Sequence, residues 1–177
     1  VMKRIPASEQ PTGVCALPLY HIFAFTVGMM LSMRYGGKLI LIPNPRDLPA
    51  VLKELSKHTF HSFPAVSTLF NGLANHPDFN TVDWSHLKVA VGGGMAVQGA
   101  VAKLWLEKTG CPICEGYGLT EASPVTHANP LGGERKVGSI GVPLPSTEAA
   151  VFDLQRRRKE VKPGQIGELA VRGPQVM

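Results

Sequence analysis

Short, continuously apolar runs alternate with segments of helical periodicity between Thr12 and Glu115. Strands that are apolar along their whole length are buried on both faces, which is typical of parallel sheets. Parallel strands also need a crossover between them, and that crossover is usually a helix. The alternation therefore predicts an α/β fold, a mainly parallel sheet covered by helices. The runs predicted as strands are GVCALPL, KLILI, TFHSF, LKVAV and CPICEG.

Helix start and stop signals place four helices between these strands. Asp47 can cap the second helix, and Pro64 stands at the favoured first position of the third. Glycines end the first helix, at Gly36 and Gly37, and the fourth, at Gly110. The predicted helical segments are YHIFAFTVGMMLSMRYGG, LPAVLKELSKH, PAVSTLFNGLANH and AVQGAVAKLWLEKTG.

Beyond Ala122 the pattern changes to a segment rich in glycine and proline. Strand-like runs near Glu148–Asp153 and Glu168–Arg172 predict an antiparallel β region after the α/β part. We place the division between residues 1–130 and residues 131–177. The basic run Arg156–Lys159 lies between the two strands and is predicted as a solvated hairpin tip, with a weak contact to membrane phosphates as the alternative.

The composition narrows the class of protein. The chain has 177 residues, is 44% hydrophobic and 18% charged, and has a formal charge of +5. Nucleic acid is not expected as a partner, because aromatic residues are not interleaved with the basic ones. Three cysteines favour a reducing compartment, and the longest apolar run, His21–Met33, is shorter than the roughly 20 residues of a membrane-spanning helix. We therefore expect a cytoplasmic protein.

Two glycine-containing turns follow predicted strands, VAVGGGMAV and ICEGYGLTEA. Ligands of parallel sheets bind beyond the carboxyl ends of the strands, and the glycines Gly92–Gly94 would allow a ligand close to the backbone. The dinucleotide fingerprint G-x-G-x-x-G is not matched, because Val97 stands at its third glycine. The alternative is that these glycines only form a tight turn.

The pair Thr120–Glu121 offers a hydroxyl beside a carboxylate. Thr120 could donate to a phosphate and Glu121 could bind Mg²⁺, while Tyr117 could lie flat against a base. The alternative is that Thr120 caps a short helix with Glu121 in its first turn. His21 lies at a strand-to-helix turn on the same predicted side of the sheet, with a satisfied core histidine as the alternative.

Other cysteine and histidine patterns favour no metal site. Cys111 and Cys114 form a single CxxC on a predicted buried strand, so we interpret them as small apolar residues. We expect no ligand role for His58 or His61, because no glutamate or cysteine partners them in the sequence.

Five motifs together resemble those of the adenylate-forming enzymes, and in detail those of bacterial long-chain fatty acid–CoA ligases. They are LPLYHIFAF, VGGGMAVQ, EGYGLTEASP, GSIGVPLPSTEA and GELAVRGPQVM, in this order and over nearly the whole chain. The resemblance implies ATP-dependent activation of a fatty acid through an acyl-adenylate, followed by transfer to coenzyme A. It also implies that residues 131–177 begin a β-barrel subdomain.

The resemblance further assigns roles to residues. Glu121 would bind Mg²⁺, Thr120 would contact the α-phosphate, and His21 would stand near the substrate carboxylate. Phe25 and Gly94 would lie beside the acyl group. The nucleotide would be held by Gly93, Gly94, Met95, Glu115, Gly116, Tyr117 and Thr120.

The resemblance also implies that the chain is a central fragment. The family's phosphate loop would precede Val1, and its catalytic lysine would follow Met177. Peripheral association with the inner face of the cell membrane and a homodimer are compatible with it. The alternatives are another adenylate-forming enzyme, a non-catalytic nucleotide-binding module and, more distantly, an NAD-dependent dehydrogenase.

Overall fold

A seven-stranded sheet forms the centre of the computed structural model, which describes residues 5–6, 8–156 and 159–177. The strand order is β2-β1-β3-β4-β5-β6-β7. The first five of these strands are mutually parallel, whereas β6 and β7 are antiparallel to their neighbours. The predicted α/β fold is thus confirmed. The strands are β1 (Thr12–Cys15), β2 (Lys38–Leu41), β3 (Ser62–Ala65), β4 (Val89–Gly92), β5 (Ile113–Gly118), β6 (Val125–Ala128) and β7 (Val142–Pro143).

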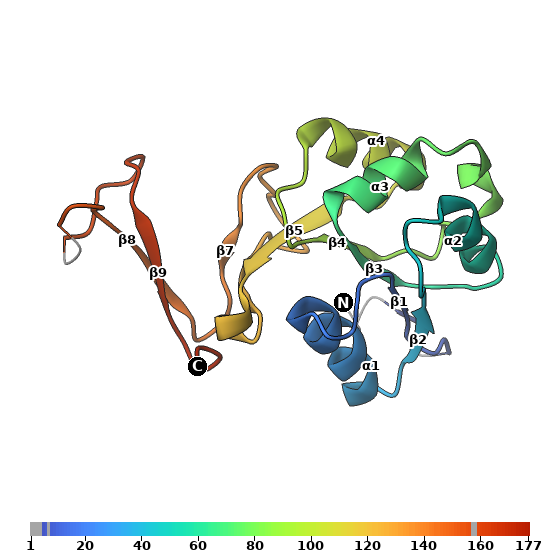
Figure 1. Cartoon of the computed structure of the whole chain (residues 1–177), viewed down its shortest axis with the longest axis horizontal. Coiled ribbons are helices and arrows are strands. Elements are labelled where there is room, and N and C mark those ends of the chain that lie inside the picture. Colours follow the sequence, from blue (N-terminus) through green and yellow to red (C-terminus); the bar gives the residue numbers. More distant parts are fainter. Residues whose placement is uncertain (1–4, 7, 157–158) are drawn as a thin grey trace.

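Helices cover both faces of this sheet (Figure 1). The predicted cap of the second helix is confirmed, because the Ala50 N–H donates to Asp47 Oδ1 at 3.1 Å. Gly110 ends the fourth helix in the left-handed conformation, with a φ of 68°. The helical elements are η2 (Ala24–Met30), α1 (Leu31–Arg34), α2 (Leu48–Leu55), α3 (Ser67–Ala74), η3 (Pro77–Thr81), α4 (Gly99–Thr109) and η4 (Thr120–Ala122).

The first predicted helix is helical but not uniformly α. Its segment η2 (Ala24–Met30) is a π-helix, and the α-helix α1 (Leu31–Arg34) continues it. π-Helical segments are rare and frequently lie at functional sites. The helix packs closely on the sheet at Gly28, where an added Cβ would stand 3.6 Å from Cys15 Sγ.

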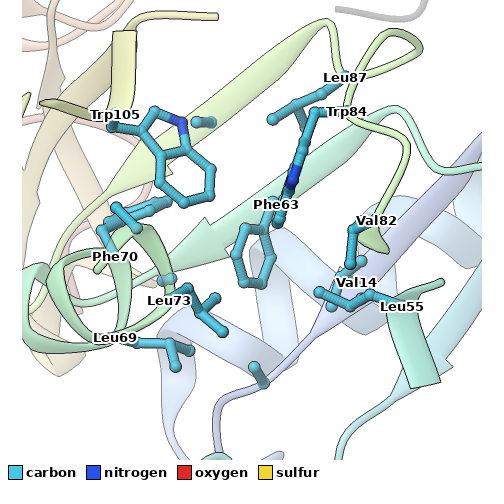
Figure 2. Packing of buried hydrophobic residues seen from close by; sticks show 14 of the residues in the cluster. Val14, Leu55, Phe63, Leu69, Phe70, Leu73, Val82, Trp84, Leu87 and Trp105 are labelled. Atoms are coloured by element: carbon cyan, nitrogen blue, oxygen red, sulfur yellow. The ribbon is translucent and has the colours of Figure 1, made fainter. Parts of the chain in front are cut away.

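The main hydrophobic core lies on the opposite face, under α2, α3 and α4. Six aromatic rings meet there, mostly edge to face. Figure 2 shows Phe63, Phe70, Trp84 and Trp105 among them. Trp105 is fully buried and lies 4.7 Å from the Phe70 ring and 5.1 Å from the Trp84 ring, measured between centroids. Such contacts add to the hydrophobic stabilisation from burial. The rings are Phe60, Phe63, Phe70, Phe79, Trp84 and Trp105.

The predicted start of the third helix at Pro64 is wrong. Pro64 lies inside β3, opposite Val91 of β4, and helix α3 begins three residues later at Ser67. A proline in a central strand would normally remove a ladder hydrogen bond. Here β1 pairs with β3 only through Gly13 and Ser62, so on the β1 side the ladder has already ended before Pro64.

The predicted antiparallel region is confirmed as a two-stranded sheet of β8 (Glu148–Phe152) and β9 (Glu168–Arg172). In Figure 1 this hairpin projects away from the seven-stranded sheet. Positions 157 and 158 of the basic run Arg156–Lys159 lie outside the described residues. Among the described residues, no helix has the length and apolar character needed to cross a bilayer.

Candidate active site

A cavity of about 470 Å³ opens at the carboxyl ends of β4 and β5. Its interior extends back along β4 to the first residue of that strand, Val89. Strand residues alternate between faces, so Val89 and Val91 line the cavity while Ala90 packs into the aromatic core. The cavity and the main core therefore occupy opposite faces of the same strand.

Most of the predicted site residues line this cavity. They come from three places in the sequence: the start of the first helix, the turn after β4, and the stretch from β5 into η4. The predicted residues that line the cavity are His21, Gly93, Gly94, Glu115, Gly116, Tyr117, Thr120 and Glu121.

Two predicted residues do not line it. Met95 is 53% exposed, and Phe25 is 41% exposed on the first helix. Instead, Phe23 and Val27 face the cavity from that helix. An added Cβ at Gly93 would come within 3.2 Å of the Phe23 ring, which shows how closely this ring lies against the glycine turn.

The stretch EGYG continues β5 rather than bending away from it. Gly116, Tyr117 and Gly118 pair with the antiparallel strand β6, and the register shifts between Tyr117 and Gly118. A Cβ at Gly118 would overlap the carbonyl oxygen of Pro124, so this position needs glycine for a close backbone approach. This close approach lies within a bulged strand and not in the turn that the sequence predicts.

Thr120 and Glu121 begin the short 3-10 helix η4. The residue that precedes this helix is Leu119, and no side chain caps it, so the alternative in which Thr120 is the cap is wrong. The Glu121 side chain is exposed at the mouth of the cavity, and among the described residues it has no hydrogen-bond or ion-pair partner. Hard oxygen donors of this kind fit Mg²⁺, which commonly takes one or two carboxylates together with phosphate oxygens.

His21 lies at the same mouth and has a defined ring orientation. The Phe23 N–H donates to His21 Nδ1 at 3.2 Å. When the ring is neutral, Nε2 therefore carries the proton and can donate to an acidic ligand.

The interior of the cavity is mostly apolar, and its buried polar groups are the Cys114 thiol, Glu115 and Asn129. Cys114 lies between the valines of β4 and the segment after β6, and its Sγ donates to the Asn129 carbonyl oxygen at 2.9 Å. Burial raises the pKa of the Cys114 thiol. Cys111 is buried too, and neither cysteine is in a disulfide, which agrees with the prediction that both are small buried residues.

The structure corrects the prediction that no acidic residue partners His58 or His61. Glu54 Oε1 lies 3.1 Å from His58 Nε2, and a second polar cluster surrounds His61. Glu9 Oε2 lies 2.7 Å from His61 Nε2 and 3.6 Å from His86 Nδ1. The Thr12 N–H donates to His61 Nδ1 at 3.1 Å, so the Nε2 atom carries the proton and donates to Glu9. A protonated Nε2 cannot ligate a metal. The cluster therefore fastens the segment around Glu9 to the sheet, and the hydrogen bond from His61 lowers the pKa of Glu9.

The fold and the cavity define a class of protein. The chain belongs to the family of AMP-binding enzymes, whose family model matches residues 2–177. Within this family it is similar to the long-chain fatty acid–CoA ligase of Escherichia coli O157:H7, with 51% identity over 164 residues. That match covers 93% of this chain and 29% of the ligase, so the chain spans less than a third of this relative.

Solved structures of related enzymes have the same fold. ATP-bound MatB from Rhodopseudomonas palustris superimposes with a TM-score of 0.83 at 28% identity, over 94% of this chain and 32% of MatB. The anthranilate–CoA ligase AuaEII in complex with anthranoyl-AMP has a TM-score of 0.87 at 25% identity, over 97% of this chain and 33% of AuaEII. Both the predicted fold and the predicted family are confirmed.

Sequence reasoning missed several cavity residues, among them Phe23, Val27, Val89 and Val91. Two signals for them are present in the sequence. Val89 and Val91 alternate along a strand that ends in the glycine turn, and Phe23 and Val27 are four residues apart on one helix.

Proposed function

We propose that this chain is the central part of a long-chain fatty acid–CoA ligase that uses ATP. The observation that carries the proposal is that one cavity combines a polar mouth with an apolar wall, which β4 and the first helix form. A fatty acid has the same division between a carboxylate and an alkyl chain. Relatives named as long-chain fatty acid–CoA ligases, and solved structures named with ATP or an acyl-AMP, support it.

In this proposal the nucleotide lies over the Gly93–Gly94 turn and beside Tyr117, at the carboxyl ends of β4 and β5. The glycines let a ligand approach the backbone, and the half-exposed Tyr117 ring offers a flat apolar face. The alkyl chain lies along β4 between Phe23, Val27 and the valines. The acyl carboxylate then points to the mouth, where His21 Nε2 can donate to it.

The proposed first step joins the carboxylate to ATP. A carboxylate oxygen forms a bond to the α-phosphorus, the α–β phosphoanhydride bond breaks, and pyrophosphate leaves. Thr120 donates to a phosphate oxygen as charge develops there. Mg²⁺, when bound, would be held by Glu121 and would neutralise phosphate charge. In the second step the sulfur of coenzyme A attacks the acyl carbonyl, and AMP leaves.

The division of the chain near residue 130, with a β-barrel subdomain after it, also belongs to this proposal. It is supported by the separate β8–β9 sheet, while β7 still pairs with β6 of the main sheet. Cytoplasmic location, peripheral membrane association and a homodimer stay predictions from the sequence.

The substitution Glu121→Gln in the full-length protein tests the assignment of this carboxylate. We expect the rate of acid-dependent pyrophosphate exchange to fall about 10²–10³-fold, the cost of losing one group that stabilises transition-state charge. Thermal stability should change little, because the side chain is exposed and unpartnered among the described residues.

The matched control is Glu107→Gln, which removes the same charge from an exposed position of α4. A panel of fatty, aromatic and amino acids in the same assay tests the substrate class. Exchange that depends on aromatic or amino acids but not on fatty acids would contradict the proposal, as would full activity of Glu121→Gln.

A further inference from the structure

Glu115 holds two separate segments of the chain with one buried carboxylate. Its Oε1 accepts the N–H of Gly138 at 2.9 Å, and its Oε2 accepts the N–H of Val97 at 3.4 Å. The residue is only 9% exposed. Because a carboxylate accepts through both oxygens, a single side chain satisfies donors on two sides of β5.

The two segments both line the cavity. The first is the turn Gly93–Val97, which connects β4 to α4 and contributes Gly93 and Gly94 to the lining. The second is the connection between β6 and β7, residues 129–141, which contributes Leu131 to the lining. Neither segment is part of a helix or strand where it meets Glu115, so its position depends on contacts of this kind.

The backbone of Glu115 is itself fixed by Asn129. The Asn129 N–H donates to the Glu115 carbonyl oxygen at 2.8 Å. The Asn129 side chain donates from Nδ2 to the Ser139 carbonyl oxygen at 2.7 Å, and its Oδ1 accepts the Lys136 N–H at 3.1 Å. The connection after β6 is thus held at three places, and Glu115 links that connection to the glycine turn.

We propose that Glu115 is a positioning residue, which sets the distance between the glycine turn and the connection after β6 through these two N–H bonds. This role rests on the proposed ligase function and differs from the direct nucleotide contact that the sequence resemblance implies. Both oxygens are already engaged by the protein. Loss of the bonds lets the glycine turn move, so it weakens binding of ATP more than it slows the chemical step.

The substitution Glu115→Gln tests this role in the full-length protein. Glutamine keeps the size of the side chain and one acceptor oxygen, but its NH₂ group faces an N–H and cannot accept from it. We expect KM for ATP to rise about tenfold or more while kcat changes less than about threefold. Amide hydrogen exchange should accelerate at Val97 or Gly138 and stay unchanged at Val91 within β4.

The control is Glu134→Gln, which removes the same charge from an exposed position of the connection after β6. Exchange at Val97 and Gly138 that does not change in a folded Glu115→Gln protein would overturn the proposal. A fall in kcat at constant KM would also overturn it, because Glu115 would then act on the reacting atoms. If the variant does not fold, amide exchange in the unmodified protein tests the proposal. Unprotected exchange of both the Val97 and the Gly138 amides would contradict the two hydrogen bonds to Glu115.

The amide measurements need no activity. If the unmodified protein shows no acid-dependent pyrophosphate exchange with any acid, the proposed function fails. In that case, the positioning role of Glu115 would still be established if the Val97 and Gly138 amides are protected from exchange in the unmodified protein and lose this protection in Glu115→Gln.

Discussion

Val89 is the lining residue of β4 that lies furthest from the glycine turn, and it offers a direct test of how the cavity selects its substrate. The residue is 3% exposed, begins β4 and lines the cavity four positions before Gly93. At a rise of about 3.3 Å per residue, this separation places it roughly 13 Å from the mouth. The substitution Val89→Phe adds four carbon atoms at this depth, so it shortens the interior without altering the mouth.

The expected magnitude follows from the alkyl groups that the new ring excludes. We take two to three displaced methylenes at about 0.8 kcal/mol each, which gives a loss of roughly 2 kcal/mol. This free energy corresponds to a reduction of about 30-fold in kcat/KM. Acids whose chains end before Val89 lose no contact, so their kcat/KM should change less than about twofold.

The assay is acyl-CoA formation by the full-length protein over a series of saturated fatty acids of increasing length. The control is Val142→Phe, the same substitution at a position of β7 that is 56% exposed. We expect a break in kcat/KM at one chain length in Val89→Phe and none in the control. An equal loss for short and long acids, or no loss at all, would refute the placement of the alkyl chain along β4.

Two further predictions concern the strands next to the mouth. Gly118→Ala should lower the free energy of unfolding by about 1–3 kcal/mol, because the new Cβ overlaps the Pro124 carbonyl oxygen. The control Gly99→Ala should cause no such loss, because an added Cβ has room there. Equal melting temperatures of the two variants would contradict the prediction. Burial lowers the pKa of His127 below 6.5, so the unfolded chain binds the extra proton as the pH falls below that value. The free energy of unfolding should therefore decrease as the pH falls below 6.5. In thermal denaturation between about pH 7 and pH 5, the melting temperature of His127→Gln should decrease less than that of the unmodified protein, and an equal decrease in both would contradict this role of His127.

Local patterns predicted most of the fold. The apolar runs became β1 to β5, Asp47 capped α2 as expected, and the β8–β9 hairpin formed where alternation and turn residues indicated it. These features depend on neighbouring residues only. Pro64 was misplaced because a proline is also tolerated inside a strand where one neighbouring ladder has ended, and the extent of that ladder is a property of the whole sheet.

The sequence also predicted which segments meet at the site, but it did not predict which side chains of those segments face the cavity. Residues beside the strand ends came together because parallel strands place their carboxyl ends at one edge. Phe23 faces the cavity and Phe25 does not. The rotation of this partly π-helical segment on the sheet determines which of the two side chains points to the cavity. The hydrogen bond between Glu9 and His61 joins positions 52 residues apart, and a local sequence pattern cannot predict a contact over this separation.

Side chains of β4 alternate between the aromatic core and the cavity, so substitutions on this strand affect either packing or the shape of the cavity. Ala90 supports the aromatic core, whereas Val89 and Val91 touch only the side where a substrate would lie. Substitutions at the valines can therefore alter which molecules fit without changing a residue of the aromatic core. The substrate specificity of an enzyme with this strand could therefore change through single substitutions that leave the aromatic core intact.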